Sequence, residues 1–251
     1  MKKKYVVVVG SGGLIGKSII KILQKKYGII KIDKNTRSSL NTYKCDLSKS
    51  SEVKKIIKNL SKKKNIFAAI NTIYPYKSSD HFLNHDIYKF KKYINSHIIS
   101  YYNFNLFFYD YFSSLNFDTK IINISSIYGS KMPNFKIYDQ TSIKSPIEYS
   151  LSKASLNMMS KYFAKWSKFN KKKVYFNTVS PAGIEGNQEK KFKSNYKKIY
   201  KAQMLKTNSL KNIINKLLLK KINGKNFVIS GGAKIWAILS TKKLPNSFCK
   251  V

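Results

Sequence analysis

Short apolar runs alternate with longer amphipathic segments along almost the whole chain. Each run is mostly apolar and bounded by polar or turn residues, which is typical of strands buried on both faces of a sheet. The expected strands cover 5–9, 29–33, 66–71, 120–125, 173–179 and 226–229. The helix-like segments lie near 14–26, 51–62, 87–114, 150–168 and 207–220. This alternation predicts an α/β fold with one mostly parallel sheet of about seven strands and helices on both faces.

No linker, internal repeat or shift in composition divides the chain, so 1–251 is expected to be a single domain. Hydrophobic residues make up 43% of it, which is enough for one sizeable core. Cys45 and Cys249 cannot build a disulfide framework, so the expected compartment is a reducing cytoplasm. No run approaches about 18 uninterrupted apolar residues, so we expect no membrane-spanning segment.

The charge of the chain bears on nucleic-acid binding. Lys and Arg number 49 against 11 Asp and Glu, which gives a formal net charge of +38. Such an excess normally suggests a nucleic acid or an anionic membrane as partner. Arg37 is the one arginine, however, and arginine is the side chain that reads bases and clamps phosphates. We interpret the scattered lysines as solvated faces and expect neither specific nucleic-acid binding nor membrane binding.

A glycine-rich turn follows the first expected strand. Gly10, Gly13 and Gly16 are spaced three residues apart where strand gives way to helix. Such a turn lets backbone N–H groups approach a pyrophosphate at a helix N-terminus, whose partial positive charge favours an anion. Asp33 ends the second strand, where a carboxylate can accept hydrogen bonds from an adenosine ribose. Together these features predict a dinucleotide-binding site.

The sequence Gly16-Lys17-Ser18 also resembles the end of a phosphate-binding P-loop. A P-loop requires a glycine five residues before Gly16, and that position is Ser11. Gly10 stands one residue too far away, which would change the ring of backbone groups around a phosphate. The dinucleotide interpretation is therefore favoured over a nucleoside triphosphatase and over glycines with a purely structural role.

A tyrosine and a lysine in the second half of the chain could form an acid–base pair. Tyr149 and Lys153 are four residues apart, so they share one face of an expected helix. A tyrosine with an ordinary pKa of about 10 is a poor catalyst at neutral pH, and we expect the Lys153 ammonium to lower that pKa. Ser125 and Ser126 end an expected strand over the same crevice.

These motifs resemble the short-chain dehydrogenase/reductase family over nearly the whole length of the chain. They occur in family order and are specific as an ordered set. The set comprises Gly10-x-x-Gly13-x-x-Gly16, Cys45-Asp46-Leu47, Ile70-Asn71, Ile94-Asn95, Ser125-Ser126, Tyr149-x-x-x-Lys153, Ser180-Pro181-Ala182-Gly183-Ile184 and Ser230-Gly231-Gly232. The resemblance implies a three-layer Rossmann-type fold and hydride transfer between NAD(P) and a carbonyl/alcohol pair.

The resemblance also implies roles for individual residues. Tyr149 is the expected acid–base residue, Lys153 holds the nicotinamide ribose and tunes Tyr149, and Ser126 orients the substrate oxygen. Asn95 is expected to anchor a water in the proton relay, and no metal is needed. The expected cofactor-binding residues are Gly10, Gly13, Leu14, Ile15, Gly16, Asp33, Asp46, Leu47, Asn71, Tyr149, Lys153, Pro181, Gly183 and Ile184.

Several segments resemble more closely the branch of the family associated with flagellin modification and nonulosonic-acid sugar pathways. These segments are 128–129, 137–142, 145–149 and 180–188. The spacing of 23 residues between Ser126 and Tyr149 is longer than is common in the family and is consistent with a substrate loop. A second departure is Asn71-Thr72-Ile73-Tyr74, which stands where the family usually has Asn-Asn-Ala-Gly.

The expected function is therefore an NAD(P)-dependent oxidoreductase acting on a sugar or sugar-nucleotide derivative, in surface-polysaccharide or flagellin glycan synthesis. A sugar-nucleotide epimerase or dehydratase that retains NAD is an alternative, although the 70 residues after Pro181 are few for the substrate domain of such enzymes. A non-catalytic dinucleotide-binding protein is another alternative, against which the set of Ser126, Tyr149 and Lys153 argues. The resemblance also implies a homodimer or homotetramer.

Two segments bear on the choice of ligands. Asp33 favours NAD over NADP because its carboxylate repels a 2′-phosphate, although Lys34 and Arg37 follow and could hold that phosphate. The lysines at 190, 193 and 197 would share one face of a helical lid, with Phe192 and Tyr196 on a neighbouring face. A basic lid favours an anionic sugar derivative as substrate, whereas the abundance of lysine favours an ordinary solvated face.

Three other features are assigned no function. His81 and His85 are four residues apart, but their surroundings indicate a loop without a third metal ligand. The aromatic residues between 101 and 112 are interpreted as a buried or subunit-interface face of a helix rather than a base-stacking surface. Cys45 is interpreted as a core residue.

Overall fold

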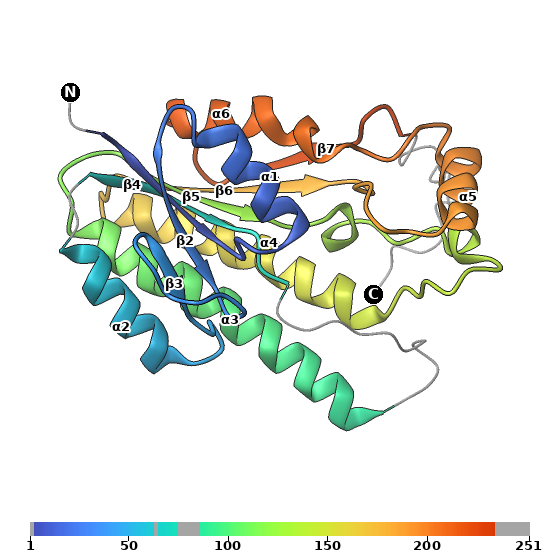
Figure 1. Cartoon of the computed structure of the whole chain (residues 1–251), viewed down its shortest axis with the longest axis horizontal. Helices are drawn as coiled ribbons and strands as arrows, with labels where there is room; N and C mark the ends of the chain where they lie inside the picture. Colours follow the sequence, from blue (N-terminus) through green and yellow to red (C-terminus); the bar gives the residue numbers. More distant parts are fainter. Residues whose placement is uncertain (1–2, 63–64, 75–85, 234–251) are drawn as a thin grey trace, which may run out of the picture.

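A single sheet of parallel strands runs through the molecule (Figure 1). The computed structural model describes residues 3–62, 65–74 and 86–233. Within these residues seven strands pair in the order β3-β2-β1-β4-β5-β6-β7. They are β1 (Tyr5–Val9), β2 (Gly28–Asp33), β3 (Thr42–Lys44), β4 (Ile66–Asn71), β5 (Thr119–Ile124), β6 (Val174–Pro181) and β7 (Asn226–Ile229). The predicted parallel α/β sheet is confirmed.

Helices cover both faces of this sheet. They are α1 (Leu14–Leu23), α2 (Ser50–Ser61), α3 (Ile87–Ser113), α4 (Ile147–Phe169), α5 (Lys190–Tyr200) and α6 (Lys211–Leu219). In Figure 1, α1 and α6 lie above the sheet, α2, α3 and α4 lie below it, and α5 stands beyond one end. None of the helices in the described ranges is both long enough and apolar enough to cross a membrane.

The central strand β1 shows why both faces are covered. Successive side chains of a strand point to opposite faces, and in this strand both sets are valines that are fully buried. Val6 and Val8 pack with α1 and α6 in one core cluster, which includes Ile19. Val7 and Val9 pack with α2, α3 and α4 in the other cluster. A strand that is apolar on both sides can satisfy both only inside a three-layer structure.

The carboxyl ends of the four central strands meet at one edge of the sheet. The strand pairing sets Val9 beside Asn71, Asn71 beside Asn123, and Ile124 beside Val179. The segments that follow these strands therefore converge, as expected for the ligand crevice of an open parallel sheet. The short 3₁₀ turns η1 (Ile127–Gly129) and η2 (Phe135–Tyr138) and helix α5 lie beyond this edge.

Two elements differ from the prediction. Strand β3 was not predicted, because its three residues lie at the edge of the sheet and are only partly buried, so they form no apolar run. Helix α4 begins at Ile147 rather than near 150, directly after Pro146. Proline restricts its own φ and lacks an N–H group, so it is well suited to precede the first turn of a helix.

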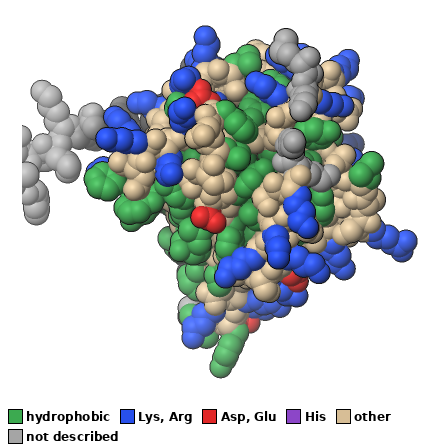
Figure 2. Space-filling model, turned by 90° about the vertical axis from the view of Figure 1, so that its left-hand side faces the viewer, with side chains coloured by type: hydrophobic (Ala, Val, Ile, Leu, Met, Phe, Trp, Pro, Cys, Tyr) green, Lys and Arg blue, Asp and Glu red, His purple; other side chains and the backbone are tan. Residues whose placement is uncertain are grey.

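Lysine side chains are spread over the face of the molecule shown in Figure 2. They are interspersed with hydrophobic and uncharged groups, and only a few acidic side chains lie among them. This face is the left-hand end of Figure 1, whereas α5 and the two 3₁₀ turns lie at the other end. The arrangement on this face is that of solvated charges rather than of one continuous basic groove.

Candidate active site

The glycine turn between β1 and α1 packs tightly against the end of β4. Gly10 has a φ of +79°, and a Cβ atom there would lie 2.8 Å from Thr72 Oγ1 and 2.9 Å from its carbonyl carbon. Thr72 Oγ1 lies 2.8 Å from the Val9 carbonyl oxygen and 3.0 Å from that of Gly10. A side chain at Gly16 would collide with the Gly10 carbonyl. Gly10 and Gly16 are therefore required by the fold of the turn itself.

Gly13 differs from its two neighbours in the motif. A Cβ atom there would meet only the Gly10 carbonyl oxygen, at 3.4 Å, which is ordinary van der Waals contact. The residue has an extended backbone and precedes the first turn of α1, with no side chain capping the helix. The fold of the chain alone therefore does not demand glycine at this position.

A cleft of about 890 Å³ opens beside this turn. Asp33 lies in it, where one carboxylate oxygen accepts a 2.9 Å hydrogen bond from the Gly12 N–H and the other a 2.9 Å bond from the Asn35 N–H. The predicted cofactor-binding residues that line the cleft are Gly10, Gly13, Leu14, Ile15, Asp33, Asp46, Leu47 and Ile184. The structure thus brings residues from the two ends of the predicted set, Gly10 and Ile184, to one cleft.

Two residues of the predicted cofactor set lie behind the cleft instead. Gly16 packs under the turn, as described above. Asn71 is buried, and its side chain bridges two parts of the core by donating to Asn123 Oδ1 at 3.0 Å and accepting from the Ile73 N–H at 3.0 Å. These two residues are positioned to hold the walls of the cleft rather than to line it.

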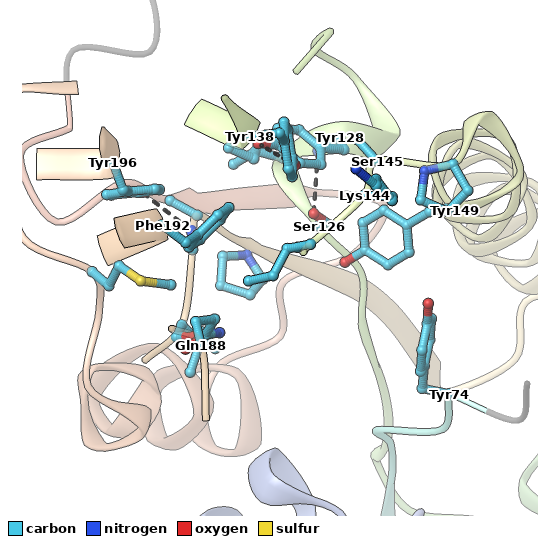
Figure 3. Close-up of a pocket in the computed structure, with 18 of the residues that line it drawn as sticks. Tyr74, Ser126, Tyr128, Tyr138, Lys144, Ser145, Tyr149, Gln188, Phe192 and Tyr196 are labelled. Atoms are coloured by element: carbon cyan, nitrogen blue, oxygen red, sulfur yellow. Dashed lines mark hydrogen bonds between the residues drawn. The ribbon is translucent and has the colours of Figure 1, made fainter. Parts of the chain in front are cut away.

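A second cavity of about 580 Å³ adjoins the first and contains the predicted catalytic hydroxyl groups. Ser126 and Tyr149 line it, and Figure 3 shows their side-chain oxygens pointing toward one another. Pro181, Gly183 and Ile184 of the predicted cofactor set line it too. Side chains of Ile15, Tyr74 and Ile184 border both cavities, so the two spaces share a wall.

Local structure fixes the two hydroxyl-bearing residues. Ser126 follows β5 in an extended conformation and caps η1, since its Oγ accepts a 3.2 Å hydrogen bond from the Tyr128 N–H. Tyr149 lies in the first turn of α4, three residues after Pro146. The long segment between them, which the sequence suggested as a substrate loop, contains both 3₁₀ turns and supplies cavity-lining side chains at 138 and 142–146.

Lys153 lies one turn further along α4 and is buried under the cavity. Its Nζ donates to Tyr101 Oη at 3.1 Å and to the Ile124 carbonyl oxygen at 3.4 Å. The same atom lies 5.9 Å from the centre of the Tyr149 ring. The predicted Tyr149–Lys153 pair on one helix face is therefore present, although the hydroxyl group that accepts a hydrogen bond from the lysine is that of Tyr101.

The expected effect of Lys153 on Tyr149 is not observed. Burial raises the pKa of Tyr149 to about 12, and a hydrogen bond with Ser126 lowers it only in part. Burial also lowers the pKa of Lys153 to about 7, because a desolvated ammonium is unfavourable. The prediction of a depressed tyrosine pKa is wrong for the chain by itself, since the buried lysine loses much of the charge that was to supply the effect.

The structure does not bring Asn95 to this site. Asn95 is exposed on α3 and lines neither cavity. The inward face of α3 carries Tyr93, His97 and Tyr101 instead, which are spaced four residues apart and are fully buried. Asn95 was predicted from its place in a family motif. The four-residue spacing of Tyr93, His97 and Tyr101 would instead have identified His97 as the residue that points inward.

His97 is a neutral, well-held side chain. Its Nδ1 lies 3.0 Å from the Tyr93 carbonyl oxygen, and its ring stacks on the Tyr93 ring with 4.0 Å between centres. Burial lowers the pKa of His97 to about 4, so the imidazole is uncharged at neutral pH and its Nδ1 donates this hydrogen bond. Together with Tyr74 and Tyr101 it forms an aromatic cluster between α3 and the cavity wall.

The lysines of the expected lid do not face the cavity. Residues 190–200 do form a helix, α5, and Phe192 and Tyr196 on it line the cavity as predicted. None of the three lid lysines lines it, and Lys193 pairs instead with Glu185 at 3.1 Å. Lys144, in the loop after η2, is the one lysine among the described residues that line this cavity. The prediction of a basic lid over the cavity is therefore wrong, because α5 directs its aromatic face toward the cavity and its lysines away from it.

The remaining sequence features have structural positions. Cys45 is buried, and burial raises the pKa of its thiol to about 12, as befits a core residue. The aromatic face of α3 is largely core, since Tyr101, Phe104 and Phe108 are buried. His81 and His85 lie outside the described residues. Within the described ranges, no three His, Cys, Asp or Glu side chains are grouped so as to hold a metal ion.

Comparisons with known proteins connect this geometry to a family. No protein-family model matches the chain. The chain is similar to the post-translational flagellin modification protein A of Campylobacter coli, with 27% identity over 217 residues that cover 79% of this chain and 84% of the relative. It is also similar to a solved short-chain dehydrogenase from Leptospira borgpetersenii with bound NAD⁺. That match has a TM-score of 0.81, 24% identity, and coverage of 92% of this chain and 93% of the other.

A further solved structure, ElxO with NADP bound, matches with a TM-score of 0.74 and 22% identity, covering 92% of this chain and 98% of the other. At these identities the solved structures show the fold, which is the Rossmann-type fold predicted from the sequence. The predicted resemblance is confirmed, to a flagellin-modification protein in sequence and to a short-chain dehydrogenase in fold.

Proposed function

We propose that this chain, which has the fold and the ordered motifs of the short-chain dehydrogenases/reductases, is an NAD(P)-dependent oxidoreductase that interconverts a carbonyl and an alcohol. One observation carries the proposal. The hydroxyl groups of Ser126 and Tyr149 face a cavity that shares a wall with the cleft beside the glycine turn. A substrate in the cavity would therefore meet both a proton donor and a cofactor held in the cleft.

The residues of the cleft fit a dinucleotide. Gly13 leaves free space directly before the N-terminus of α1, where a diphosphate would be favoured by the helix dipole. Ser100 lines the cleft from α3, and its buried hydroxyl has no hydrogen-bond partner within the described structure. The carboxylates of Asp33 and Asp46 stand where hydroxyl and amino groups of an adenosine can be bound.

Tyr149 is suited to act as the proton donor. With a pKa of about 12 the phenol keeps its proton at neutral pH, so it can protonate a carbonyl oxygen as that oxygen gains negative charge. Ser126 is placed to share a hydrogen bond with the same oxygen. A bound nicotinamide supplies the hydride, so the balanced reaction is carbonyl plus reduced cofactor plus one proton, giving alcohol plus oxidised cofactor. The reverse reaction uses the same groups.

NAD is the preferred cofactor in this proposal. Asp33 lines the cleft at the end of β2, where its charge disfavours a second phosphate on the ribose. Lys34 also lines the cleft, whereas Arg37 is exposed and does not. The similar solved structures include one with NAD⁺ and one with NADP, so the fold accommodates either dinucleotide.

The cavity favours a sugar or sugar-nucleotide derivative that carries an anionic group. Its wall is rich in aromatic rings, including Tyr128, Tyr138, Phe192 and Tyr196, on which the apolar faces of a sugar ring can pack. Lys144 is available for a phosphate or carboxylate, and among the described lining residues there is no Asp or Glu to oppose it. The name of the Campylobacter coli relative, a flagellin modification protein, is consistent with a role in glycan synthesis.

We further infer that the chain, as one domain over 1–251, forms a homodimer or homotetramer through α4. This helix exposes large apolar side chains, which a partner copy could bury. They are Leu151, Met158, Tyr162, Trp166 and Phe169. Light scattering on the purified protein would give its mass in solution.

The test of the proposed function has two stages. The first is a titration of the protein with NADH and NADPH, followed by cofactor fluorescence. The second is a screen of keto-sugars and sugar nucleotides for oxidation of the bound cofactor, repeated with Tyr149→Phe. We expect binding by both proteins and turnover by the wild type. Failure of both dinucleotides to bind would contradict the proposal, and so would full turnover by the variant.

A further inference from the structure

Tyr74 is the residue that most clearly separates this site from the family pattern. It follows β4 at the fourth position of Asn71-Thr72-Ile73-Tyr74, where the family usually has glycine. A glycine would leave this wall open, whereas the tyrosine fills it. Its side chain borders both the cofactor cleft and the cavity with the catalytic hydroxyls. Tyr74 therefore places a large polar side chain at the boundary between the cofactor cleft and the substrate cavity.

The aromatic cluster on α3 holds Tyr74 in place. Tyr93 is fully buried and donates a hydrogen bond from its hydroxyl to Tyr74 Oη, at 3.2 Å. The His97 ring packs edge-on against the Tyr74 ring, with 5.1 Å between centres. His97 is in turn held in place, because its ring stacks on Tyr93 and its Nδ1 is hydrogen-bonded to the Tyr93 carbonyl. The position of the Tyr74 hydroxyl is therefore determined by the fold.

The hydroxyl of Tyr74 is directed toward the reacting groups. Its ring stands edge-on to the Tyr149 ring, with 5.8 Å between centres and 73° between planes, and Figure 3 shows its hydroxyl pointing toward Tyr149. Tyr74 remains 42% exposed, so a ligand in the cavity can contact it. Partial burial of the side chain raises the pKa of Tyr74, which keeps its hydroxyl protonated. Since Tyr74 Oη accepts from Tyr93, its own proton is available to a ligand.

We propose that Tyr74 is a specificity-determining residue, which donates a hydrogen bond to a hydroxyl group on the carbon next to the reacting carbonyl. In this arrangement Ser126 and Tyr149 donate hydrogen bonds to the carbonyl oxygen. Tyr74 donates a hydrogen bond to the oxygen of the neighbouring hydroxyl group, from the adjacent wall of the cavity. The preferred substrates are then α-hydroxy ketones, or vicinal diols in the reverse direction. This inference rests on the proposed oxidoreductase function and narrows its substrate class.

Two ring ketones that differ by one hydroxyl group test the proposal. The probes are 2-hydroxycyclohexanone and cyclohexanone, each reduced with the preferred cofactor, and the measured quantity is the ratio of their kcat/KM values. We expect the wild type to favour the hydroxylated ketone by roughly tenfold or more, the size of one neutral hydrogen bond. In Tyr74→Phe the ratio should fall to near one, through loss with the hydroxylated ketone alone.

Two more variants separate a specific contact from a general loss of structure. Tyr93→Phe removes the donor that holds Tyr74 in place, so the ratio should fall in the same direction but by less. Tyr88→Phe is the matched control, because Tyr88 lies on the same helix, is 81% exposed and lines neither cavity. Its ratio should equal that of the wild type. The dissociation constant of the cofactor should be unchanged in Tyr88→Phe and should change much less than the ratio in Tyr74→Phe and Tyr93→Phe.

Several results would overturn the inference while leaving the oxidoreductase function intact. They are a wild-type ratio near one, an equal loss on both ketones in Tyr74→Phe, and a lack of turnover of either ketone by protein that binds the cofactor. A protein that binds neither NADH nor NADPH would instead contradict the proposed function, and this inference would fall with it.

Discussion

The cofactor cleft and the substrate cavity are built in different ways. The cleft takes most of its lining from positions 9–47, where β1, β2 and the turns after them follow one another in the sequence. The cavity is assembled from segments around 74, 125–149 and 181–204, which meet only because their strands end at one edge. The small residues of the glycine turn line one side of the cleft, whereas aromatic side chains line much of the cavity.

The two regions also differ in how they treat charge. The cleft carries acidic and basic groups such as Asp33, Asp46 and Lys17. In the cavity, burial raises the pKa of each of the phenols of Tyr128, Tyr138, Tyr149 and Tyr196, so they stay neutral. The difference agrees with the proposed function, in which the cleft binds a charged dinucleotide and the cavity offers neutral hydroxyl donors and apolar surfaces to the substrate.

The largest expected effect falls on the cavity alone. Tyr149→Phe removes the proposed proton donor and changes no residue that lines the cleft, so turnover should fall by roughly 10²- to 10⁴-fold. The dissociation constants of NADH and NADPH should change little. Steady-state kinetics on a substrate from the screen and a fluorescence titration measure the two quantities. A variant that loses cofactor affinity as strongly as turnover would show that the two regions are not separable in this way.

The glycine pattern and the strand alternation predicted the cleft well, because both depend on residues close in the sequence. Gly10, Asp33 and Asp46 lie where their motifs indicated. Strand β3 was not predicted, since pairing with its neighbour rather than an apolar pattern makes it a strand. Most of the fold could therefore be derived from local patterns, and the exception is an element that tertiary pairing creates.

The cavity was predicted less completely, because its composition depends on the direction in which each side chain points. Asn95 is one example, since the helical period of α3 directs His97 inward instead. The lid lysines are another, because the aromatic face of α5 packs inward. The pKa of Tyr149 depends on burial, which the spacing between Tyr149 and Lys153 does not reveal. The sequence shows that Tyr74 departs from the family motif. Its hydrogen bond with Tyr93 on α3 joins residues far apart in the sequence, so no local pattern predicts it.

Lys153 offers a test of burial in the cavity region. Its pKa falls from 10.5 to about 7 on folding, so between these pH values the unfolded chain binds more protons than the folded chain. The free energy of unfolding of the wild type should therefore rise with pH across this range, by at most about 1.4 kcal/mol per pH unit from this group. Lys153→Met lacks this contribution and should be the more stable protein near pH 7.

Urea unfolding of both proteins at several pH values between 7 and 10 measures this difference. The stability advantage of Lys153→Met should narrow as the pH rises, while the variant remains inactive. Lys161→Met is the matched control, because Lys161 is exposed on the same helix. Its difference from the wild type should not vary with pH. A constant advantage for Lys153→Met would mean that the lysine stays charged in the folded protein.

Two glycines of the cleft should respond differently to the same substitution. Gly10→Ala places a Cβ atom against Thr72 at a positive φ, so it should lower the free energy of unfolding, by roughly 1–3 kcal/mol. Gly13→Ala meets only ordinary contact and should leave stability nearly unchanged, while weakening dinucleotide binding. Thermal unfolding and a cofactor titration distinguish the two. Normal cofactor affinity in Gly13→Ala would remove Gly13 from the proposed binding set.

The choice between NAD and NADP should depend on one side chain of the cleft. Asp33→Ser removes the charge that opposes a 2′-phosphate and a carboxylate that could bind the ribose. We expect the wild type to bind NADH more tightly than NADPH, and the ratio of their dissociation constants to shift by roughly tenfold toward NADPH in the variant. Titrations side by side give both constants. Tighter binding of NADPH by the wild type would contradict the preference for NAD.

The smallest expected effect concerns Lys144, the lysine that lines the cavity within the described part of the chain. Lys144 is exposed in the loop after η2 and lines the cavity, whereas Lys197 on α5 is exposed and does not. If the substrate carries a phosphate or carboxylate, Lys144→Ala should raise its KM by a few-fold, because an exposed ion pair contributes about 1 kcal/mol or less.

The salt dependence of KM separates this contact from the general charge of the protein. Screening weakens exposed ion pairs, so the KM of the wild type should rise with salt, and Lys144→Ala should flatten that rise. Lys197→Ala removes the same charge at a distance from the cavity and should behave like the wild type. Equal effects of the two substitutions would mean that the high net charge attracts the anion without a specific contact. No effect of either would favour a neutral substrate, held in the cavity by its aromatic and hydroxyl groups alone.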